Sequence, residues 1–266
     1  MSNNYGYLKS PKDLRDYHLN KTYMAVELPE AFEVAHSDIK SQGTVGACVA
    51  FSVVEILESQ QLGNKYSTNW IYGYRPKGYS TTRGMYPSQA LKTVKGTGYV
   101  PYDVLPGNKE VPKVIELVNS RLDELTEEAS KRHIYSYARL RSIYDIKEAI
   151  YLLKCPVLVC IDIDENGLKL DSNGVAYVPE NPDGGHAVVC YGWNETGFLI
   201  QNSWGTTWGK RGVFILPYEY EITEAWSVNV GEADEIEDII TPPKYLLLRE
   251  FLMLFVKLFN KIFIKN

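Results

Sequence analysis

Cys48 is the residue of this sequence best placed to act as a nucleophile. It follows Gly46 and opens a helical pattern over 47–62 (ACVAFSVVEILESQQL), in which apolar residues gather on one side. A thiol attacks a carbonyl usefully only as a thiolate, and a helix N-terminus or a nearby imidazolium lowers its pKa. A catalytic Cys48 should therefore have a lowered pKa. Taken alone, the same cysteine also fits a buried structural role.

His186 is the histidine best placed to take up the proton of that thiol. It follows Gly184 and Gly185 and opens the apolar run AVVCYGW, whereas His133 lies in the charged run KRH. A base at the junction of a small-residue turn and a buried strand has space for a substrate beside it. Without a partner, His186 would equally fit a strand-edge histidine with no catalytic role.

Two amide side chains complete a catalytic constellation. Gln42 lies six residues before Cys48 in SQGTVGAC, where its amide can donate to an oxyanion together with the Cys48 backbone N–H. Asn202 lies in LIQNSWGTTWGKRGVF and can hold the imidazole ring without taking its proton. Trp204, two residues later, can shield that hydrogen bond from water.

Three segments together resemble the active-site segments of the papain-like cysteine peptidases. They are QGTVGACVAFS, GGHAVVCYGW and QNSWGTTWGKRGVF, and they follow the family's order of Gln, Cys, His and Asn. The opening YGYLKSPKDLRDY and the later PYEYEITEAWSV resemble the bacterial and viral branch with short N-terminal segments.

The resemblance implies an α+β fold of two lobes with the substrate cleft between them. A helical N-terminal lobe would carry Gln42 and Cys48, and an antiparallel, β-barrel-like C-terminal lobe would carry His186 and Asn202. The implied activity is that of a cysteine peptidase, most simply an endopeptidase, which cleaves proteins or peptides through a Cys48 acyl-thioester without metal or cofactor. Further positions that match cleft residues are Gly84, Met85, Tyr86, Cys160, Gly184, Gly185, Ala187 and Trp204. Tyr86 with Ala187 would suit an apolar substrate side chain.

The sequence departs from the family pattern at three positions, of which Val45 fits a reducing compartment and the other two would mark a loss of turnover. Val45 replaces a cysteine that usually forms a disulfide, Val49 replaces a tryptophan, and Met85 replaces a glycine whose backbone binds substrate. The Met85 side chain would either crowd the cleft or leave its backbone free to pair with substrate. A catalytically silent binding module and an acyl transferase that uses the same site are the alternatives.

Composition narrows the partners and the compartment. The 266 residues carry a net charge of −5, which argues against nucleic-acid binding. Three of the four cysteines lie in apolar runs without an evenly spaced framework, so we expect free thiols and a cytoplasmic or other reducing compartment. The polar N-terminus lacks the apolar core of a secretory signal.

Residue patterns divide the chain into four parts. Residues 1–35 are either a short prosegment across the cleft or a structural strap, and 36–230 are the peptidase domain. Residues 231–243 form an acidic linker. Residues 244–266 form a basic amphipathic helix that would contact a membrane surface, the enzyme, a second copy or another partner. Beyond 47–62, we expect helices at 88–96, 110–130 and 145–154, a loop at 65–84, and strands at 156–162, 187–191, 197–201 and 212–216.

Overall fold

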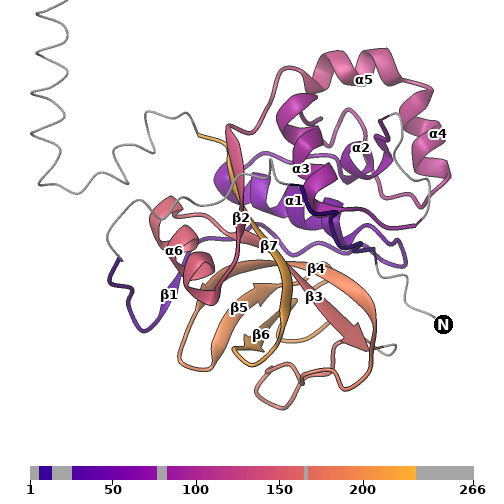
Figure 1. The fold of residues 1–266 in the computed structure, drawn as a ribbon. Helices are drawn as coiled ribbons and strands as arrows, with labels where there is room; N and C mark the ends of the chain where they lie inside the picture. The colour runs from indigo at the N-terminus through magenta and orange to yellow at the C-terminus, as the bar shows by residue number, and fades with distance from the viewer. Residues whose placement is uncertain (1–5, 14–25, 77–82, 165–166, 232–266) are drawn as a thin grey trace, which may run out of the picture. The chain divides into compact units, whose positions relative to one another are not determined.

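Most of the helices lie on one side of the fold and the sheet on the other (Figure 1). The computed structural model describes residues 6–13, 26–76, 83–164 and 167–231, and residues 1–230 form one compact unit. Five helices of the described chain gather in the upper part of Figure 1, and the sheet lies below them. The expected linker 231–243, apart from Gly231, and the expected tail helix 244–266 lie outside the described residues.

The helical lobe is built around one central helix, α1. Nearly all residues of α1 are buried, so it is apolar on most sides and the other helices pack around it. Pro87 opens α3, where its missing N–H costs no helical hydrogen bond. The helices are α1 Cys48–Gln60, α2 Thr68–Gly73, α3 Pro87–Gly96, α4 Lys113–Asn119 and α5 Leu122–Ala129.

Two local expectations were wrong in this lobe. The segment expected as a loop at 65–84 contains α2, because the Ser67 hydroxyl accepts from the Trp70 N–H and caps the helix. The fully buried Trp70 indole donates to the Gly98 carbonyl at 2.9 Å, which fixes α2 by a contact distant in sequence. The single helix expected at 110–130 is broken into α4 and α5 around Ser120 and Arg121.

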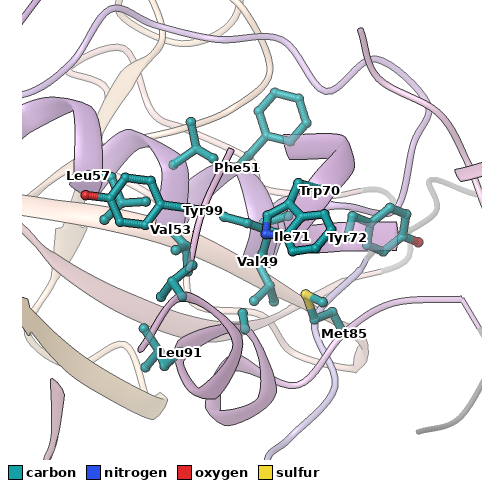
Figure 2. Close-up of a cluster of buried hydrophobic side chains, with 14 of the residues drawn as sticks. Val49, Phe51, Val53, Leu57, Trp70, Ile71, Tyr72, Met85, Leu91 and Tyr99 are labelled. Atoms are coloured by element: carbon teal, nitrogen blue, oxygen red, sulfur yellow. The ribbon is translucent and has the colours of Figure 1, made fainter. Parts of the chain in front are cut away.

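Val49 and Met85, two departures from the family pattern, belong to the core of the helical lobe. Figure 2 shows both side chains in one cluster with Trp70, Tyr72 and Leu91. Both are fully buried. The Met85 side chain therefore points into the core and not into the cleft, and its backbone N–H and carbonyl are hydrogen-bonded to Gly6 and Leu8.

The second lobe is an antiparallel sheet with one helix, α6 Ile143–Leu153, packed on β3, β4 and β7 (Figure 1). Its strand order is β2-β7-β3-β4-β5-β6, and β1 pairs with β4. The strands are β1 Phe32–Glu33, β2 Ser136–Leu140, β3 Val157–Asp164, β4 Pro182–Trp193, β5 Gly197–Gln201, β6 Val213–Pro217 and β7 Ile222–Asn229. The α+β class is confirmed, although β1, β2 and β7 were not expected from the sequence.

Candidate active site

Cys48 is the first residue of α1 and is fully buried. The turn before Cys48 is held by a residue that lies far away in the sequence, because the Gly46 N–H donates to Glu110 Oε2 at 2.8 Å. The other oxygen of Glu110 accepts from the Tyr72 hydroxyl at 3.1 Å, and that hydroxyl accepts from the Gly84 N–H. One carboxylate thus links the turn before Cys48 to the segment of Gly84 and Met85.

His186 lies within β4, where it pairs with Ile161 of β3, and its ring is fully buried. Its Nε2 lies 2.8 Å from Asn202 Oδ1, so Nε2–H donates to the amide oxygen. The Ser203 N–H donates to the same oxygen and fixes the amide orientation. Trp204 stacks on the imidazole with ring centroids 4.6 Å apart. His186 Nδ1 forms no hydrogen bond within the described residues, which leaves it as the basic nitrogen.

Gln42 is fixed by the segment that carries Asn202. Its Nε2 donates to the Val45 carbonyl at 2.7 Å, and its Oε1 accepts from the Ser203 hydroxyl at 2.6 Å. Its backbone N–H donates to the Ser203 carbonyl at 2.8 Å. An amide held through its oxygen keeps one Nε2 hydrogen for an oxyanion. The sequence did not single out Ser203, because the contact joins residues that lie far apart in the chain.

Residues 6–13, here called the covering segment, lie over Cys48 and contact both lobes. The Met85 N–H donates to the Gly6 carbonyl at 2.7 Å, and the Leu8 N–H donates to the Met85 carbonyl at 3.0 Å. The Tyr7 N–H reaches the Gly185 carbonyl at 3.4 Å. A Cβ on Gly6 would lie 1.9 Å from the Gly46 carbonyl oxygen, so only glycine fits against the turn before Cys48.

Burial keeps both reacting groups uncharged in this arrangement. Burial raises the pKa of the Cys48 thiol to about 11, although the backbone N–H groups of Ala187, Gly6 and Val49 oppose the rise. Burial also lowers the pKa of His186 to about 4, against the opposing effect of its hydrogen bond to Asn202. The lowered thiol pKa expected from the sequence is thus not found while the covering segment is in place.

The expected substrate-binding positions fall into two groups. Four of them surround the covering segment: Gly84 and Met85 meet Gly6 and Leu8, while Cys160 and Gly185 lie beside Tyr7. The other four are placed by the elements that carry them. Ala187 directs its N–H at the Cys48 sulfur, Trp204 covers His186, Tyr86 precedes α3, and Gly184 pairs with Ile163 in the β3–β4 ladder.

All four cysteines are free and buried, consistent with Val45 standing where a disulfide partner would otherwise be. Among the described residues, no cluster of three or more His, Cys, Asp or Glu side chains is arranged to hold a metal ion. In the same part of the chain, no helix has the length and apolar character needed to cross a membrane.

The chain is similar to known cysteine proteases. Residues 28–228 match the profile of the papain family cysteine proteases. A peptidase C1-like protein of Acanthamoeba polyphaga mimivirus is 26% identical, over 90% of this chain and 89% of its own length. Papain from Carica papaya is 29% identical over 67% of this chain, and the match covers 50% of the length of the papain sequence. The chain likewise spans about half the length of the cathepsin L of Sarcophaga peregrina.

The fold also has a close counterpart among solved structures. Xylellain, a cysteine protease from Xylella fastidiosa, superimposes with a TM-score of 0.70 at 21% identity, over 87% of this chain and 97% of its own. The fold is that of a cysteine peptidase of two lobes. The chain belongs to the papain family of cysteine proteases, which confirms the family and the hydrolase class expected from the sequence.

Proposed function

We propose that the chain is an endopeptidase that works through an acyl-thioester on Cys48. The observation that carries the proposal is the His186 ring, held by Asn202 through Nε2 with Nδ1 left free as a base. His186 takes the proton of the Cys48 thiol, the sulfur attacks the peptide carbonyl, and His186 passes that proton to the leaving amine as the C–N bond breaks. Water then hydrolyses the thioester while His186 acts as base. Gln42 and the Cys48 N–H stabilise the oxyanion.

We further propose that the covering segment keeps this site closed in the intact chain. Gly6 and Leu8 use both hydrogen-bonding groups of Met85, which a substrate backbone would otherwise use. Gly6 also lies against the turn that carries the nucleophile. A substrate therefore reaches Cys48 only after residues 6–13 move away or are removed. This supports the prosegment interpretation of residues 1–35.

Replacing Gly6 by alanine tests both proposals in the full chain. The new methyl group collides with the Gly46 backbone, so the covering segment should lift and Cys48 should react with iodoacetamide about 10-fold faster or more. Hydrolysis of an unfolded protein substrate should rise in parallel, with internal cleavages seen by mass spectrometry. The matched control is Gly96→Ala, because a Cβ there meets nothing within 4 Å.

The same measurements separate the competing functions. In the Gly6→Ala background, His186→Ala should abolish hydrolysis. A labelled Cys48 without any hydrolysis would favour the catalytically silent binding module. Transfer of the acyl group to an added amine in preference to water would favour the acyl transferase. Unchanged labelling in Gly6→Ala would refute the closed-site proposal.

A role for the C-terminal segment is proposed on sequence alone. Residues 244–266 combine Lys257, Lys261 and Lys265 at spacing four with a wide apolar face, a pattern that suits the surface of an anionic membrane. We propose that it attaches the enzyme to such a surface in a reducing compartment. Flotation of the full chain with phosphatidylserine vesicles tests this, and dimers in sedimentation without vesicle binding would instead indicate self-association.

A further inference from the structure

We propose that the pocket filled by Tyr7 selects substrates with a tyrosine-like side chain, a neutral group that ends in a hydroxyl. This pocket, here called the Tyr7 site, consists of Cys160, Gly185, Thr223 and Glu224. The inference rests on the proposed peptidase function and names the side chain that the same site prefers. It differs from the apolar preference that Tyr86 and Ala187 suggest.

The Tyr7 ring is held tightly on its flat side and at its tip. A Cβ on Gly185 would lie 2.3 Å from Tyr7 Cδ1, so the ring packs directly on the glycine backbone. The phenol oxygen lies 3.2 Å from Glu224 Oε2 and 3.1 Å from Thr223 Oγ1. Burial, as the main cause, raises the pKa of Tyr7. The phenol therefore keeps its proton and donates it to the carboxylate.

Glu224 is a buried acceptor that a purely apolar side chain would leave incompletely bonded. Its Oε1 accepts from Trp226 Nε1 at 2.6 Å, and its Oε2 accepts from the Ser10 N–H at 3.0 Å and from Tyr7. The side chain is almost fully buried. When residues 6–13 leave, Oε2 loses both donors. An occupant with a hydroxyl at the right depth restores one, whereas phenylalanine or leucine restores none.

The charge of Glu224 is already balanced, which argues against a cationic occupant. Arg139 Nη2 lies 3.5 Å from Glu224 Oε1, and its guanidinium stacks over the Trp226 ring at 4.4 Å. A lysine or arginine entering the Tyr7 site would bring a second positive charge close to Arg139. Like charges near one carboxylate oppose each other. The site therefore favours a neutral donor over an ionic one.

The backbone contacts indicate how a substrate reaches this site. Tyr7 lies between Gly6 and Leu8, which hydrogen-bond the N–H and carbonyl of Met85, and its own N–H reaches Gly185. An extended peptide that takes this place beside Met85 directs one side chain toward Gly185. That side chain enters the space that the Tyr7 ring leaves.

The test uses the intact chain and four active-site probes, N-acetyl-Xaa-alanine chloromethyl ketones with Tyr, Phe, Leu or Arg at Xaa. Second-order rates of Cys48 alkylation are measured for each probe by peptide mass mapping. Every probe reacts only with the open form of the covering segment. The equilibrium constant for opening therefore multiplies all four rates equally and cancels in the ratio of any two. We expect the Tyr probe to react about 10-fold faster than Phe or more, and faster than Arg and Leu.

A pair of matched variants assigns the preference to the carboxylate. Glu224→Gln keeps the shape of the side chain and should reduce the Tyr/Phe ratio to within about 3-fold. Glu219→Gln makes the same chemical change at an exposed position and should leave the ratio unchanged. The series is repeated in Tyr7→Ala, which removes the competing phenol and should raise all four rates together.

Each remaining outcome contradicts a definite claim. A Tyr/Phe ratio near one, or a preference for Arg, with Cys48 still labelled would overturn the Tyr7-site inference and leave the peptidase proposal standing. A preference for Tyr that persists in Glu224→Gln would show that the Glu224 carboxylate does not cause the preference. Failure of all four probes to label Cys48, in Tyr7→Ala as well, would overturn the inference and the peptidase proposal together.

Discussion

At the scale of single residues, Ser203 is predicted to matter through Gln42. Its hydroxyl holds Gln42 Oε1 at 2.6 Å, and without it the amide keeps only the bond from Nε2 to the Val45 carbonyl, which fixes its orientation less well. In the Gly6→Ala background, Ser203→Ala should lower kcat about 10-fold and change KM little, because the oxyanion forms only in the transition state. Ser203→Thr, which keeps a hydroxyl, should retain more activity.

A double-mutant cycle separates this positioning role from a general loss of structure. If Ser203 acts only through the amide, Gln42→Ala combined with Ser203→Ala should be no slower than Gln42→Ala alone. Additive losses in kcat would contradict the prediction. The unfolding midpoint in urea, measured on each variant, reports any loss of stability independently of activity.

The pH dependence of Cys48 alkylation is the second prediction at this scale. With a thiol pKa of about 11 and an imidazole pKa of about 4, both groups are neutral between these values while the segment covers them. Alkylation of the wild-type chain by iodoacetamide should therefore be slow at pH 5–8 and rise toward pH 11. Removing the cover admits water and favours the ion pair, so Gly6→Ala should react at pH 5–6.

His186→Ala is the control for the ion pair. In the Gly6→Ala chain it should abolish the reactivity at pH 5–6 and return Cys48 to an ordinary thiol profile near pH 8–9. Rapid labelling of the wild type already at pH 5–6 would show that the covering segment does not neutralise the pair.

The sequence singled out the candidate site residues more readily than the residues that hold them. Cys48, His186, Asn202 and Gln42 lie in local motifs whose residue types and order are visible in the sequence, and their catalytic roles stay a prediction. Glu110 and Glu224 look like ordinary surface acids in the sequence. Their roles depend on contacts with Gly46, Tyr7 and Arg139 that only the folded chain brings together.

At the scale of elements, Glu55 makes α1 sensitive to pH. It is fully buried in the helix, and burial raises its pKa to about 8. The folded state therefore binds more protons than the unfolded state between about pH 4.5 and 8. Stability from this residue is fully present below pH 4.5 and is lost as the pH rises through 8. At pH 7 the free energy of unfolding should be roughly 3 kcal/mol lower than it would be if this group stayed protonated in both the folded and the unfolded state.

Glu55→Gln should remove this dependence because an amide of the same shape has no charge to desolvate. We expect its urea midpoint to exceed that of the wild type at pH 8 and to approach it at pH 5. Glu58→Gln, three residues further along α1, is the contrasting variant. Glu58 forms an ion pair with Lys40 at 2.9 Å and accepts a hydrogen bond from the Tyr66 N–H. Loss of the Glu58 carboxylate should lower the free energy of unfolding by about 1–3 kcal/mol at both pH 5 and pH 8. A Glu55→Gln chain less stable than wild type at pH 8 would contradict the argument.

Elements with strong local periodicity were predicted well, and elements fixed by distant contacts were not. The pattern at 47–62 gave α1 almost to its ends, and β5 was found at 197–201. The short α2 was missed because its tyrosine- and glycine-rich surroundings read as loop. Strands β2 and β7 were missed because each is completed by pairing with a partner far away in the chain, as Leu140 with Ala225.

At the scale of the whole molecule, three of the four buried thiols, Cys48, Cys155 and Cys190, should report two different openings. Cys48 is covered by residues 6–13, a short segment that backbone hydrogen bonds join to Met85 and Gly185. Cys155 and Cys190 lie in the body of the fold, with Cys190 in β4 at the centre of the sheet. Release of the covering segment exposes little surface, whereas exposure of Cys190 requires unfolding of the lobe.

These openings differ in their response to urea because the sensitivity to denaturant scales with the surface exposed. At pH 8, below the unfolding midpoint, the alkylation rate of Cys48 should be highest and nearly independent of urea. The rates of Cys155 and Cys190 should be far lower and should rise steeply and in parallel, as expected for global unfolding. Gly6→Ala should accelerate only Cys48, and Gly96→Ala none of the three. Equal urea dependence for all of them would show that the covering segment unfolds only together with the two lobes, so that it is a structural strap rather than a separable cover.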